Sequence, residues 1–255
     1  MEIVIRTDYG AISDEAFRIV EGEVARRPAL VVGLATGRTP LGLYERWAAS
    51  KRSFKRARFF NLDEFVGLGP EHAGSFHRTL RERLLAPLRV PPRNVFLLRG
   101  DVKDPDKAAA AYEKVLRAAG GIDLQILGVG RNGHIGFNEP GSSLGSRTRT
   151  KTLTDETRAA HAEAFGSMDR VPRFAITMGI GTILEARYVV LLASGEEKAQ
   201  VVRRMIEGPV TAEVPGSALQ LHPRATAVLD EAAASALARR DYWKWVAENK
   251  WRVGQ

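Results

Sequence analysis

"DLQILGVGRNGHIGFNEPGSS", residues 123–143, joins a short apolar run to a loop that is rich in glycine and polar side chains. The run 123–130 has the length and composition of a buried strand. The loop that follows it carries His134, Asn138 and Glu139 within six positions, which core packing alone does not require. In parallel α/β sheets, ligands bind beyond the carboxyl ends of the strands. The stretch therefore predicts a buried strand followed by a functional loop.

The same alternation of apolar strands and helices runs along the whole chain. Strands apolar on both faces that alternate with helices indicate a parallel sheet covered on both sides. We therefore predict an α/β fold, a mostly parallel sheet with helices on both faces, in a single domain over residues 1–255. Strands are expected at 2–6, 29–35, 57–64, 94–98, 123–130, 174–179, 188–194 and 225–230. Helices are expected at 12–26 (opened by Ser13), from Leu41, at 75–86 (capped by Ser75), at 105–118, from Glu196 to Ile206 and at the C-terminus.

Composition narrows the class of protein. The chain has 44% hydrophobic and 27% charged residues, which is ordinary for a globular protein. It has no cysteine, and its five histidines show no zinc-type spacing, so we expect neither disulfides nor a metal site. No apolar run is long enough to span a membrane, and the N-terminus does not resemble a signal peptide. A cytoplasmic location is the expectation.

The net charge of +8 raises the alternative of nucleic-acid binding, with "KRSFKRARFF" (51–60) as the densest basic run. Aromatic residues make up only 7% of the chain, and no nucleic-acid recognition motif is present. We therefore expect no nucleic-acid partner. Arginine-rich surfaces also suit small anionic ligands.

Two of the loops that follow strands carry candidate binding and acid–base groups. In "ATGRTP" (35–40), the hydroxyls of Thr36 and Thr39 and the backbone N–H groups at a helix N-terminus could bind an anion, and Gly37 allows close approach. The alternative is a simple tight turn. "NLDEF" (61–65) places Asp63 and Glu64 side by side, and in an extended segment only one of them faces the ligand crevice. Such a carboxylate is a candidate general base, and the alternative is a solvated acidic turn.

The opening loop and the loop after strand 188–194 complete the set. The imidazole of a histidine such as His134 can both donate and accept a proton, a neighbouring carboxylate such as Glu139 can orient it, and Asn132 supplies an amide in the same loop. Lys198 in "ASGEEKA" (193–199) offers another anion contact, or is simply a solvated lysine. No GxSxG, GxGxxG or GxxxxGK[ST] motif is present, which lowers the prospects of a serine hydrolase or a nucleotide-binding site. The residues favour acid–base chemistry on a small anionic ligand.

The motifs, taken in order, resemble the glucosamine-6-phosphate deaminase family. The matching segments lie between Val31 and Glu231: "GLATGRTPLGLY", "FFNLDEFVGL", "GVGRNGHIGFNEPGSSLGSRTRTKTL", "ITMGIGTIL" and "GSALQLHP". The resemblance implies a Rossmann-like fold, a homo-oligomer and no cofactor. It also implies conversion of glucosamine 6-phosphate and water to fructose 6-phosphate and ammonia, an isomerising and hydrolytic deamination.

The same resemblance implies the role of each residue. His134 would assist opening of the sugar ring, Asp63 would move the C2 proton to C1, and Glu139 would orient His134. Asn132 stands where some members have aspartate, so the imidazolium form of His134 lacks an attractive charge that it has in those members. Thr36, Gly37, Arg38, Thr39 and Lys198 would bind the substrate and its phosphate.

The chain departs from the family pattern at Glu163. In "AHAEAF" (160–165), Glu163 occupies the position of an arginine that grips the sugar phosphate in other members. A carboxylate there repels a phosphate. Arg38 could supply the missing charge; otherwise the substrate is a different, unphosphorylated amino sugar.

Further alternatives concern regulation and function. The positions of an allosteric site found in some members match Ser142, Arg149, Lys151 and Thr152, and the alternative there is a basic surface strand. A 6-phosphogluconolactonase shares the fold, but such enzymes usually continue "GHTASLFPG", whereas this chain reads "GHIGFNEPG". A non-catalytic sugar-phosphate sensor is the third reading, although Asp63, His134 and Glu139 are all present.

Overall fold

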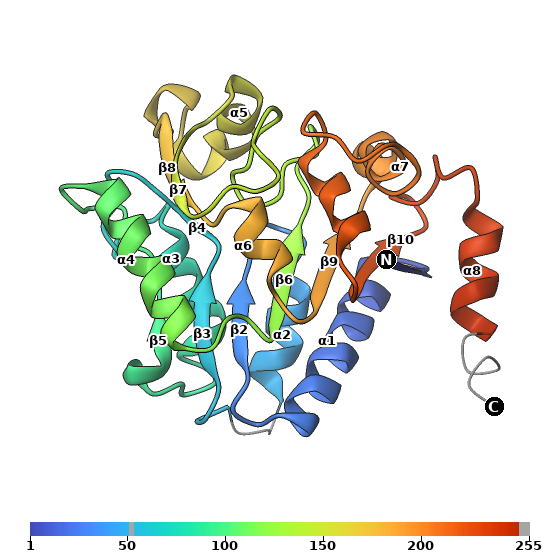
Figure 1. Cartoon of the computed structure of the whole chain (residues 1–255), viewed down its shortest axis with the longest axis horizontal. Helices are drawn as coiled ribbons and strands as arrows, with labels where there is room; N and C mark the ends of the chain where they lie inside the picture. The colour runs from blue at the N-terminus through green and yellow to red at the C-terminus, as the bar shows by residue number, and fades with distance from the viewer. Residues whose placement is uncertain (51–53, 250–255) are drawn as a thin grey trace.

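A seven-stranded parallel sheet forms the centre of the molecule (Figure 1). The computed structural model describes residues 1–50 and 54–249. The strand order β1-β10-β9-β6-β2-β3-β5 confirms the prediction of a mostly parallel α/β sheet. The strands are β1 (Glu2–Arg6), β10 (Ala225–Asp230), β9 (Val189–Ala193), β6 (Leu124–Gly128), β2 (Val31–Leu34), β3 (Arg58–Asn61) and β5 (Val95–Phe96).

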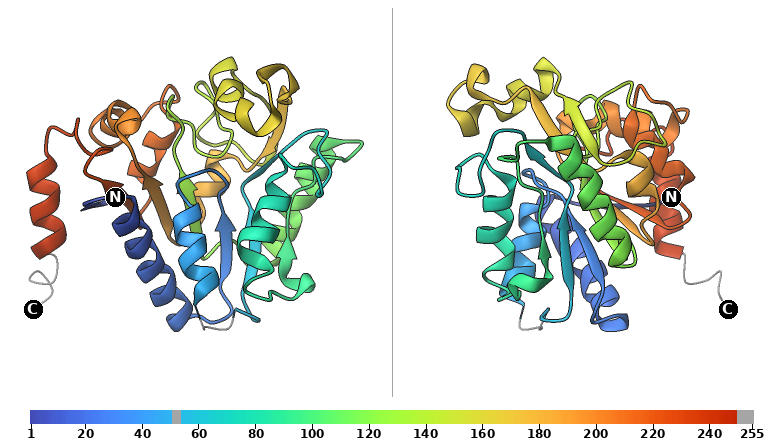
Figure 2. Two further views of the ribbon diagram at one scale, coloured as in Figure 1. Left: turned by 180° about the vertical axis from the view of Figure 1, so that it is seen from behind. Right: turned by 60° about the vertical axis from the view of Figure 1, so that its left-hand side comes forward.

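Helices cover both faces of this sheet, as Figure 2 shows from two sides. Strand β9 explains why the strands are apolar throughout. Its Val190 and Leu192 pack in a core with α1 and α2, whereas Val189 and Leu191 pack in a second core with α4, α6 and α7. The helices are α1 (Tyr9–Arg26), α2 (Leu41–Ala49), α3 (Phe76–Leu80), α4 (Pro105–Ala118), α6 (Ile180–Leu184), α7 (Ala199–Glu207) and, beside β1 at the edge, α8 (Arg240–Asn249).

A second, antiparallel sheet lies at the carboxyl end of the first and corrects two expectations. It contains β4 (Asp63–Phe65), β8 (Phe174–Thr177) and β7 (Arg149–Thr152), and α5 (Asp155–Phe165) accompanies it. The stretch 57–64 is therefore two strands in different sheets, and 174–179 does not belong to the parallel sheet. The buried Asn61 makes the break: its side chain donates to the Asp63 carbonyl and accepts from the Leu98 N–H. These bonds turn the chain out of the parallel sheet.

Three helix boundaries also differ from expectation. Helix α1 begins at Tyr9 because Asp8, not Ser13, caps it by accepting from the Ala11 N–H. Ser75 caps α3 as predicted, but the helix then continues as a π-helical turn, Arg81–Leu85. The predicted helix from Glu196 starts with a 3-10 turn, Glu196–Lys198, before α7. The other short 3-10 segments are Pro92–Asn94, Met168–Arg170 and Pro215–Leu221.

The order of strands fixes where a ligand can bind. From β2 the chain moves outward to β3 and β5, and then returns to the other side of β2 as β6. This reversal creates a crevice beyond the carboxyl ends of β2 and β6, the usual ligand site of open α/β sheets. The loops "TGRTP" and 130–143 begin at those two ends. The topology therefore brings the two most distinctive loops of the sequence together.

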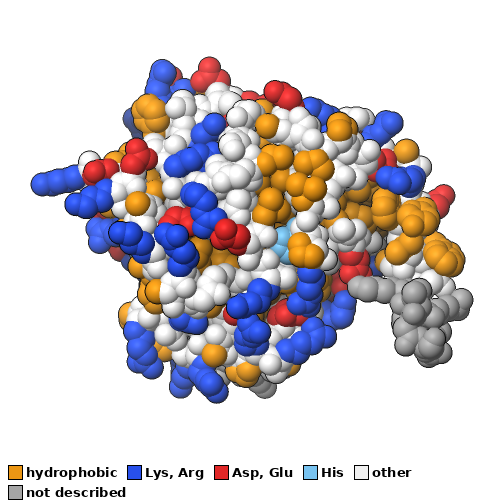
Figure 3. All heavy atoms as spheres, viewed as in Figure 1, with side chains coloured by type: hydrophobic (Ala, Val, Ile, Leu, Met, Phe, Trp, Pro, Cys, Tyr) orange, Lys and Arg blue, Asp and Glu red, His pale blue; other side chains and the backbone are white. Residues whose placement is uncertain are grey.

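The surface adds two observations. On the face shown in Figure 3, Lys and Arg side chains are scattered among acidic and apolar ones. Of the basic run 51–60, residues 51–53 lie outside the described residues.

Among the described helices, none is both long and apolar enough to cross a membrane. The absence of a nucleic-acid partner and the single domain stay predictions.

Candidate functional site

The loop after β6 holds its shape through glycines. The imidazole of His134 lies directly over Gly130, where a Cβ would come within 2.4 Å of either ring nitrogen. Gly136 has a φ of +56°, and a Cβ there would lie 2.9 Å from Thr177 Oγ1 and 3.5 Å from Asp63 Oδ2. Larger residues at these positions would displace His134 or push the loop away from Asp63. The glycines therefore place the imidazole and the carboxyl group in one site.

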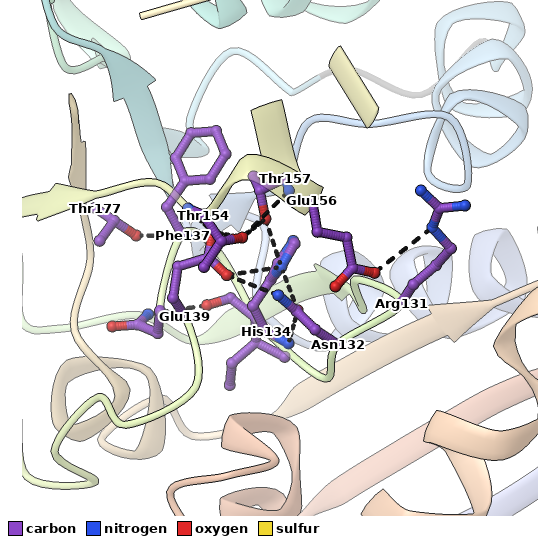
Figure 4. Close-up of polar contacts among 11 residues, drawn as sticks. Arg131, Asn132, His134, Phe137, Glu139, Thr154, Glu156, Thr157 and Thr177 are labelled. Atoms are coloured by element: carbon purple, nitrogen blue, oxygen red, sulfur yellow. Dashed lines mark hydrogen bonds and ion pairs between the residues drawn. The ribbon is translucent and has the colours of Figure 1, made fainter. Parts of the chain in front are cut away.

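His134, Asn132 and Glu139 form a hydrogen-bonded chain (Figure 4). The Asn132 side chain donates from Nδ2 to Glu139 Oε2 at 2.8 Å, and its Oδ1 lies 2.8 Å from His134 Nδ1. Glu139 Oε2 is itself 3.6 Å from His134 Nδ1. The backbone N–H of His134 also donates to Asn132 Oδ1. Asn132 thus bridges the imidazole and the carboxylate.

This chain fixes the tautomer of His134. An ionised carboxylate only accepts hydrogen bonds, so the NH₂ group of Asn132 faces Glu139 and its carbonyl oxygen faces His134. A carbonyl oxygen only accepts, so His134 Nδ1 carries the proton. In the neutral imidazole, Nε2 is then the atom with a free lone pair. His134 is set to accept a proton at Nε2.

Glu139 is held in its charged form although it is only 2% exposed. Burial raises its pKa, but interactions with His134, Thr157 and Asn132 outweigh that effect and lower the pKa to about 2. Its other oxygen, Oε1, accepts from the backbone N–H and the hydroxyl of Thr154 at 3.2 and 3.3 Å. Glu139 is therefore a permanent carboxylate at neutral pH.

Asp63, at the start of β4, has the opposite environment. It is 6% exposed, and among the described residues its carboxyl group accepts a single hydrogen bond, a long one of 3.4 Å from Thr36 Oγ1. Burial and the neighbouring charge of Glu64 raise its pKa to about 8, against a small opposing effect of Thr36. A carboxyl group that titrates near neutral pH can both take and return a proton.

Glu64 points the other way, as the alternation of an extended segment requires. Its carboxylate accepts from the Ser75 hydroxyl and from the backbone N–H groups of Phe76 and His77. It thereby satisfies the N-terminus of α3. Of the two adjacent carboxyl groups, only Asp63 faces the loops after β2 and β6.

The loop after β2 contributes to the same site. Thr36 contacts Asp63, and Gly37 has a φ of +136°, a conformation that favours glycine. The first N–H groups of α2 are already used, because Leu41 donates to the Arg38 carbonyl and Gly42 donates to Tyr9 Oη. An anion at this loop would therefore contact residues 36–39 rather than the helix end. Arg38 is exposed and Thr39 half-buried at the edge of the site.

Lys198 lies in the 3-10 turn after β9 and is half-buried. Burial lowers its pKa, and the positive charges of Arg131 and Arg38 lower it further. Lys198 is thus within electrostatic range of both arginines, which come from two other loops. The loops after β2, β3, β6 and β9 meet at one edge of the sheet.

The four residues matched to an allosteric site lie in two segments, the loop 130–143 and strand β7. Ser142 is buried, and its hydroxyl has no hydrogen-bond partner within the described chain. Arg149 donates to Asn138 Oδ1 at 2.9 Å, which ties β7 to the 130–143 loop. Lys151 is half-buried and Thr152 is exposed further along β7. An allosteric role for the four residues stays a prediction.

Three residues near the site were not predicted from the sequence: Thr154, which caps α5, and Thr157 and His161 within that helix. Thr154 caps α5 and binds Glu139, and Thr157 Oγ1 lies 3.4 Å from His134 Nδ1. His161 packs against Phe65, Phe76 and Phe137, and burial followed by the charges of His134 and Arg38 lowers its pKa to about 4. Helix α5 was not predicted, because it buries only Thr157, Arg158 and Phe165 and so shows no apolar stripe. Its sequence signals were confined to its ends: Thr154 as the N-cap with Asp155 and Glu156 in the first turn, and Gly166 at the C-terminus.

No group of three or more His, Asp or Glu side chains that could hold a metal ion is found among the described residues. The chemistry available at the site is that of one carboxyl group with a raised pKa, one imidazole and a fixed carboxylate. Such a set transfers protons between neighbouring atoms of a small molecule.

Comparison with known proteins agrees with this geometry. The family model described as glucosamine-6-phosphate isomerases/6-phosphogluconolactonase matches residues 10–229. The chain is 50% identical over 249 residues to the glucosamine-6-phosphate deaminase of Streptomyces avermitilis, covering 96% of this chain and 95% of that one. It is 49% identical over 231 residues to the enzyme of Hahella chejuensis, covering 89% and 88% of the two chains.

Solved structures give the same result. A monomeric glucosamine-6-phosphate deaminase is similar with a TM-score of 0.90 at 40% identity, covering 92% of this chain and all of that one. The 6-phosphogluconolactonase of Trypanosoma cruzi is more distant, with a TM-score of 0.75 at 25% identity, covering 93% and 97%. The chain therefore belongs to the family of glucosamine-6-phosphate isomerases and 6-phosphogluconolactonases.

Proposed function

We propose that this protein is a glucosamine-6-phosphate deaminase, which converts glucosamine 6-phosphate and water to fructose 6-phosphate and ammonia. The observation that carries the proposal is that Asp63 and His134 have the surroundings that proton transfer requires. Asp63 is a buried carboxyl group with a pKa raised to about 8, and His134 is held by Asn132 and Glu139 with Nε2 free. The named relatives at about half identity support the same reaction.

In the proposed reaction, His134 acts first. Its Nε2 takes the proton of the C1 hydroxyl and returns a proton to the ring oxygen, so that the ring opens to the aldehyde. Protonation of the imidazole during this step is stabilised by the carboxylate of Glu139, 3.6 Å from Nδ1. Asn132 keeps the imidazole ring of His134 oriented throughout this step.

Asp63 then moves a proton along the open chain. Its carboxylate removes the proton from C2 while one proton of the substrate ammonium passes to O1, which gives an enolamine. Asp63 then delivers its proton to C1, and the amino carbon C2 becomes an iminium. Water adds to the iminium and ammonia leaves, so the net reaction is hydrolytic as well as isomerising. The raised pKa of Asp63 means that the free enzyme holds this group largely protonated at pH 7. The ammonium group of the bound substrate favours its ionised form.

Thr36, Gly37, Arg38, Thr39 and Lys198 are proposed to bind the phosphate end of the substrate. Glu163, which stands where the resemblance implies an arginine, is exposed on α5. The phosphorylated substrate is supported by the cations of two loops, Arg38 and Lys198, at the same edge. A homo-oligomer and a cytoplasmic location stay predictions.

The test compares substrates. We expect release of ammonia from glucosamine 6-phosphate with a kcat/KM at least about 100-fold above that for free glucosamine, since charge-assisted bonds to the phosphate contribute roughly 1.5–3 kcal/mol each. Equal turnover of the free sugar would show that the substrate is unphosphorylated. Hydrolysis of 6-phosphogluconolactone without ammonia release from the amino sugar would show a lactonase instead.

A further inference from the structure

Arg131 is a charged side chain of the site loop that the proposed chemistry leaves without a role. It stands between Gly130 and Asn132, next to the residue that orients His134. Its ionic contact within the described chain is with Glu156 in the first turn of α5, where Nε lies 3.8 Å from Oε1. Both side chains are about half exposed, at 51% and 50%. Figure 4 shows Glu156 and Arg131 side by side, to the right of His134 in that view. Such an exposed and long ion pair holds the guanidinium only weakly.

The backbone packs the loop that carries Arg131 against the start of the helix that follows Lys198. A Cβ on Gly133, two residues after Arg131, would lie 3.3 Å from Cγ2 of Val201. Val201 follows Lys198 by three residues, which is about one helical turn. The carbonyl of Gly133 also accepts from the Gly216 N–H, which fixes the loop against the segment after α7. The loops after β6 and β9 are therefore packed together, with one cation on each.

The electrostatics of Lys198 agree with this placement. After burial, the positive charges of Arg131 and Arg38 are the interactions that lower its pKa. Arg131 and Arg38 thus repel Lys198 at the carboxyl edge of the sheet, while the carboxylates of Glu197 and Glu156 offset part of that repulsion. Within the described residues, Arg38 has no ion pair and Arg131 has only the 3.8 Å contact with Glu156. A bound anion would relieve this repulsion.

We infer that Arg131 is a specificity-determining residue: it supplies the third cation of the subsite for the phosphate of the substrate, and Glu156 competes with that phosphate for its guanidinium. The inference rests on the proposed function for the identity of the ligand. The arrangement gives the site a cation in place of the arginine that is absent at Glu163. It also connects occupation of the anion subsite to α5, because Glu156 lies between Thr154 and Thr157, which contact Glu139 and His134.

Arg131→Gln tests the inference, with Arg93→Gln as the matched control. Arg93 is exposed in the turn before β5, at the opposite end of the sheet, so its loss changes the net charge equally. For Arg131→Gln we expect the KM for glucosamine 6-phosphate to rise about tenfold or more with kcat within about twofold, as for a lost charged hydrogen bond. We expect the Kd for inorganic phosphate, measured by calorimetry, to rise by a similar factor. Arg93→Gln should change neither.

Glu156→Gln supplies the opposite change. Release of Arg131 from its competitor should lower the KM and the phosphate Kd by about two- to fivefold, the magnitude of an exposed ion pair. If Arg131→Gln matches Arg93→Gln in both measurements, Arg131 does not contact the anion and the inference fails. A fall in kcat without a change in phosphate Kd would mean a disturbed catalytic loop and would equally overturn it. Phosphate binding needs no turnover, so failure of the proposed reaction would be seen separately.

Discussion

Asp63 and Glu139 are both buried carboxyl groups of one site, yet their surroundings drive their pKa values in opposite directions. Asp63 has one long hydrogen bond from Thr36 and a second carboxyl group, Glu64, as its neighbour. Glu139 accepts from Asn132 and Thr154 and lies beside the imidazole of His134. Burial raises both pKa values, but only Glu139 has enough donors to reverse the effect. The two groups therefore differ in their donors and neighbouring charges, and Asp63 is also the more strongly desolvated of the two.

This difference supports the roles proposed for the two groups. A carboxyl group with a pKa near 8 exchanges its proton within the working pH range, whereas one with a pKa near 2 does not. Asp63 is thus suited to carry the proton between C2 and C1. Glu139 is suited to stay charged while His134 changes its protonation state. Variants that remove one group should fail in ways that distinguish these roles.

Asp63→Asn should have the largest effect on activity. The amide cannot remove the C2 proton, so we expect kcat to fall by about 10⁴-fold, at the upper end for a general base. Measurement of hydrogen–deuterium exchange at C2 of the substrate would locate the loss at proton transfer. Exchange at the wild-type rate in this variant would assign the C2 proton to another group.

The same variant should gain stability, which separates it from a misfolded protein. In the unfolded chain Asp63 ionises near its ordinary pKa of 3.8, and in the folded protein only near 8. Stability from the protonated form is therefore fully present below about pH 4 and is lost as pH rises toward 8, by up to about 1.4 kcal/mol per pH unit. Asp63→Asn has no such loss, so its Tm should exceed that of the wild type by a margin that grows from pH 4 to 8. A constant margin would contradict the raised pKa.

Glu139→Gln should lose both activity and stability. Without the fixed carboxylate, the Asn132 amide and the His134 tautomer are no longer defined, and we expect kcat to fall by about 10²-fold. The lowered pKa of Glu139 contributes stability that is present above about pH 4.5 and lost as pH falls toward 2. The variant should therefore be less stable by roughly 2–3 kcal/mol at pH 7 and equal to the wild type near pH 2.

Glu113→Gln is the matched control for that change. Glu113 is also buried with a lowered pKa: burial acts to raise it, but bonds from Thr148, Thr182 and Arg147 prevail. It lies on α4, away from His134, so its variant should lose stability with kcat retained. If both variants lose kcat to the same degree, Glu139 acts through stability alone.

The sequence predicted the parallel sheet well because β2, β6 and β9 each carry apolar residues for two cores. It predicted the chemistry of the 130–143 loop because that chemistry is local: Asn132, His134 and Glu139 meet within a single loop. The break at Asn61 was not predictable, since it depends on a hydrogen bond to Leu98, far along the chain. The contacts of α5 with Glu139 escaped prediction for the same reason.

Asn132→Asp should have the smallest effect on activity, and it tests whether a second charge next to His134 matters. The new carboxylate places a negative charge 2.8 Å from His134 Nδ1, at the position of the Asn132 oxygen, and directly opposite the carboxylate of Glu139. Both carboxylates favour the imidazolium, so the midpoint of His134 protonation, followed by NMR, should lie at a higher pH than in the wild type. We expect kcat to change by less than about tenfold, because Nδ1 keeps an acceptor. Asn94→Asp, in the turn before β5, adds the same charge at the opposite end of the sheet and should leave the His134 midpoint unchanged. An unchanged midpoint in Asn132→Asp would mean that a second negative charge does not stabilise the imidazolium beyond the effect of Glu139, which is already ionised. Asn132 would then serve only to orient the imidazole.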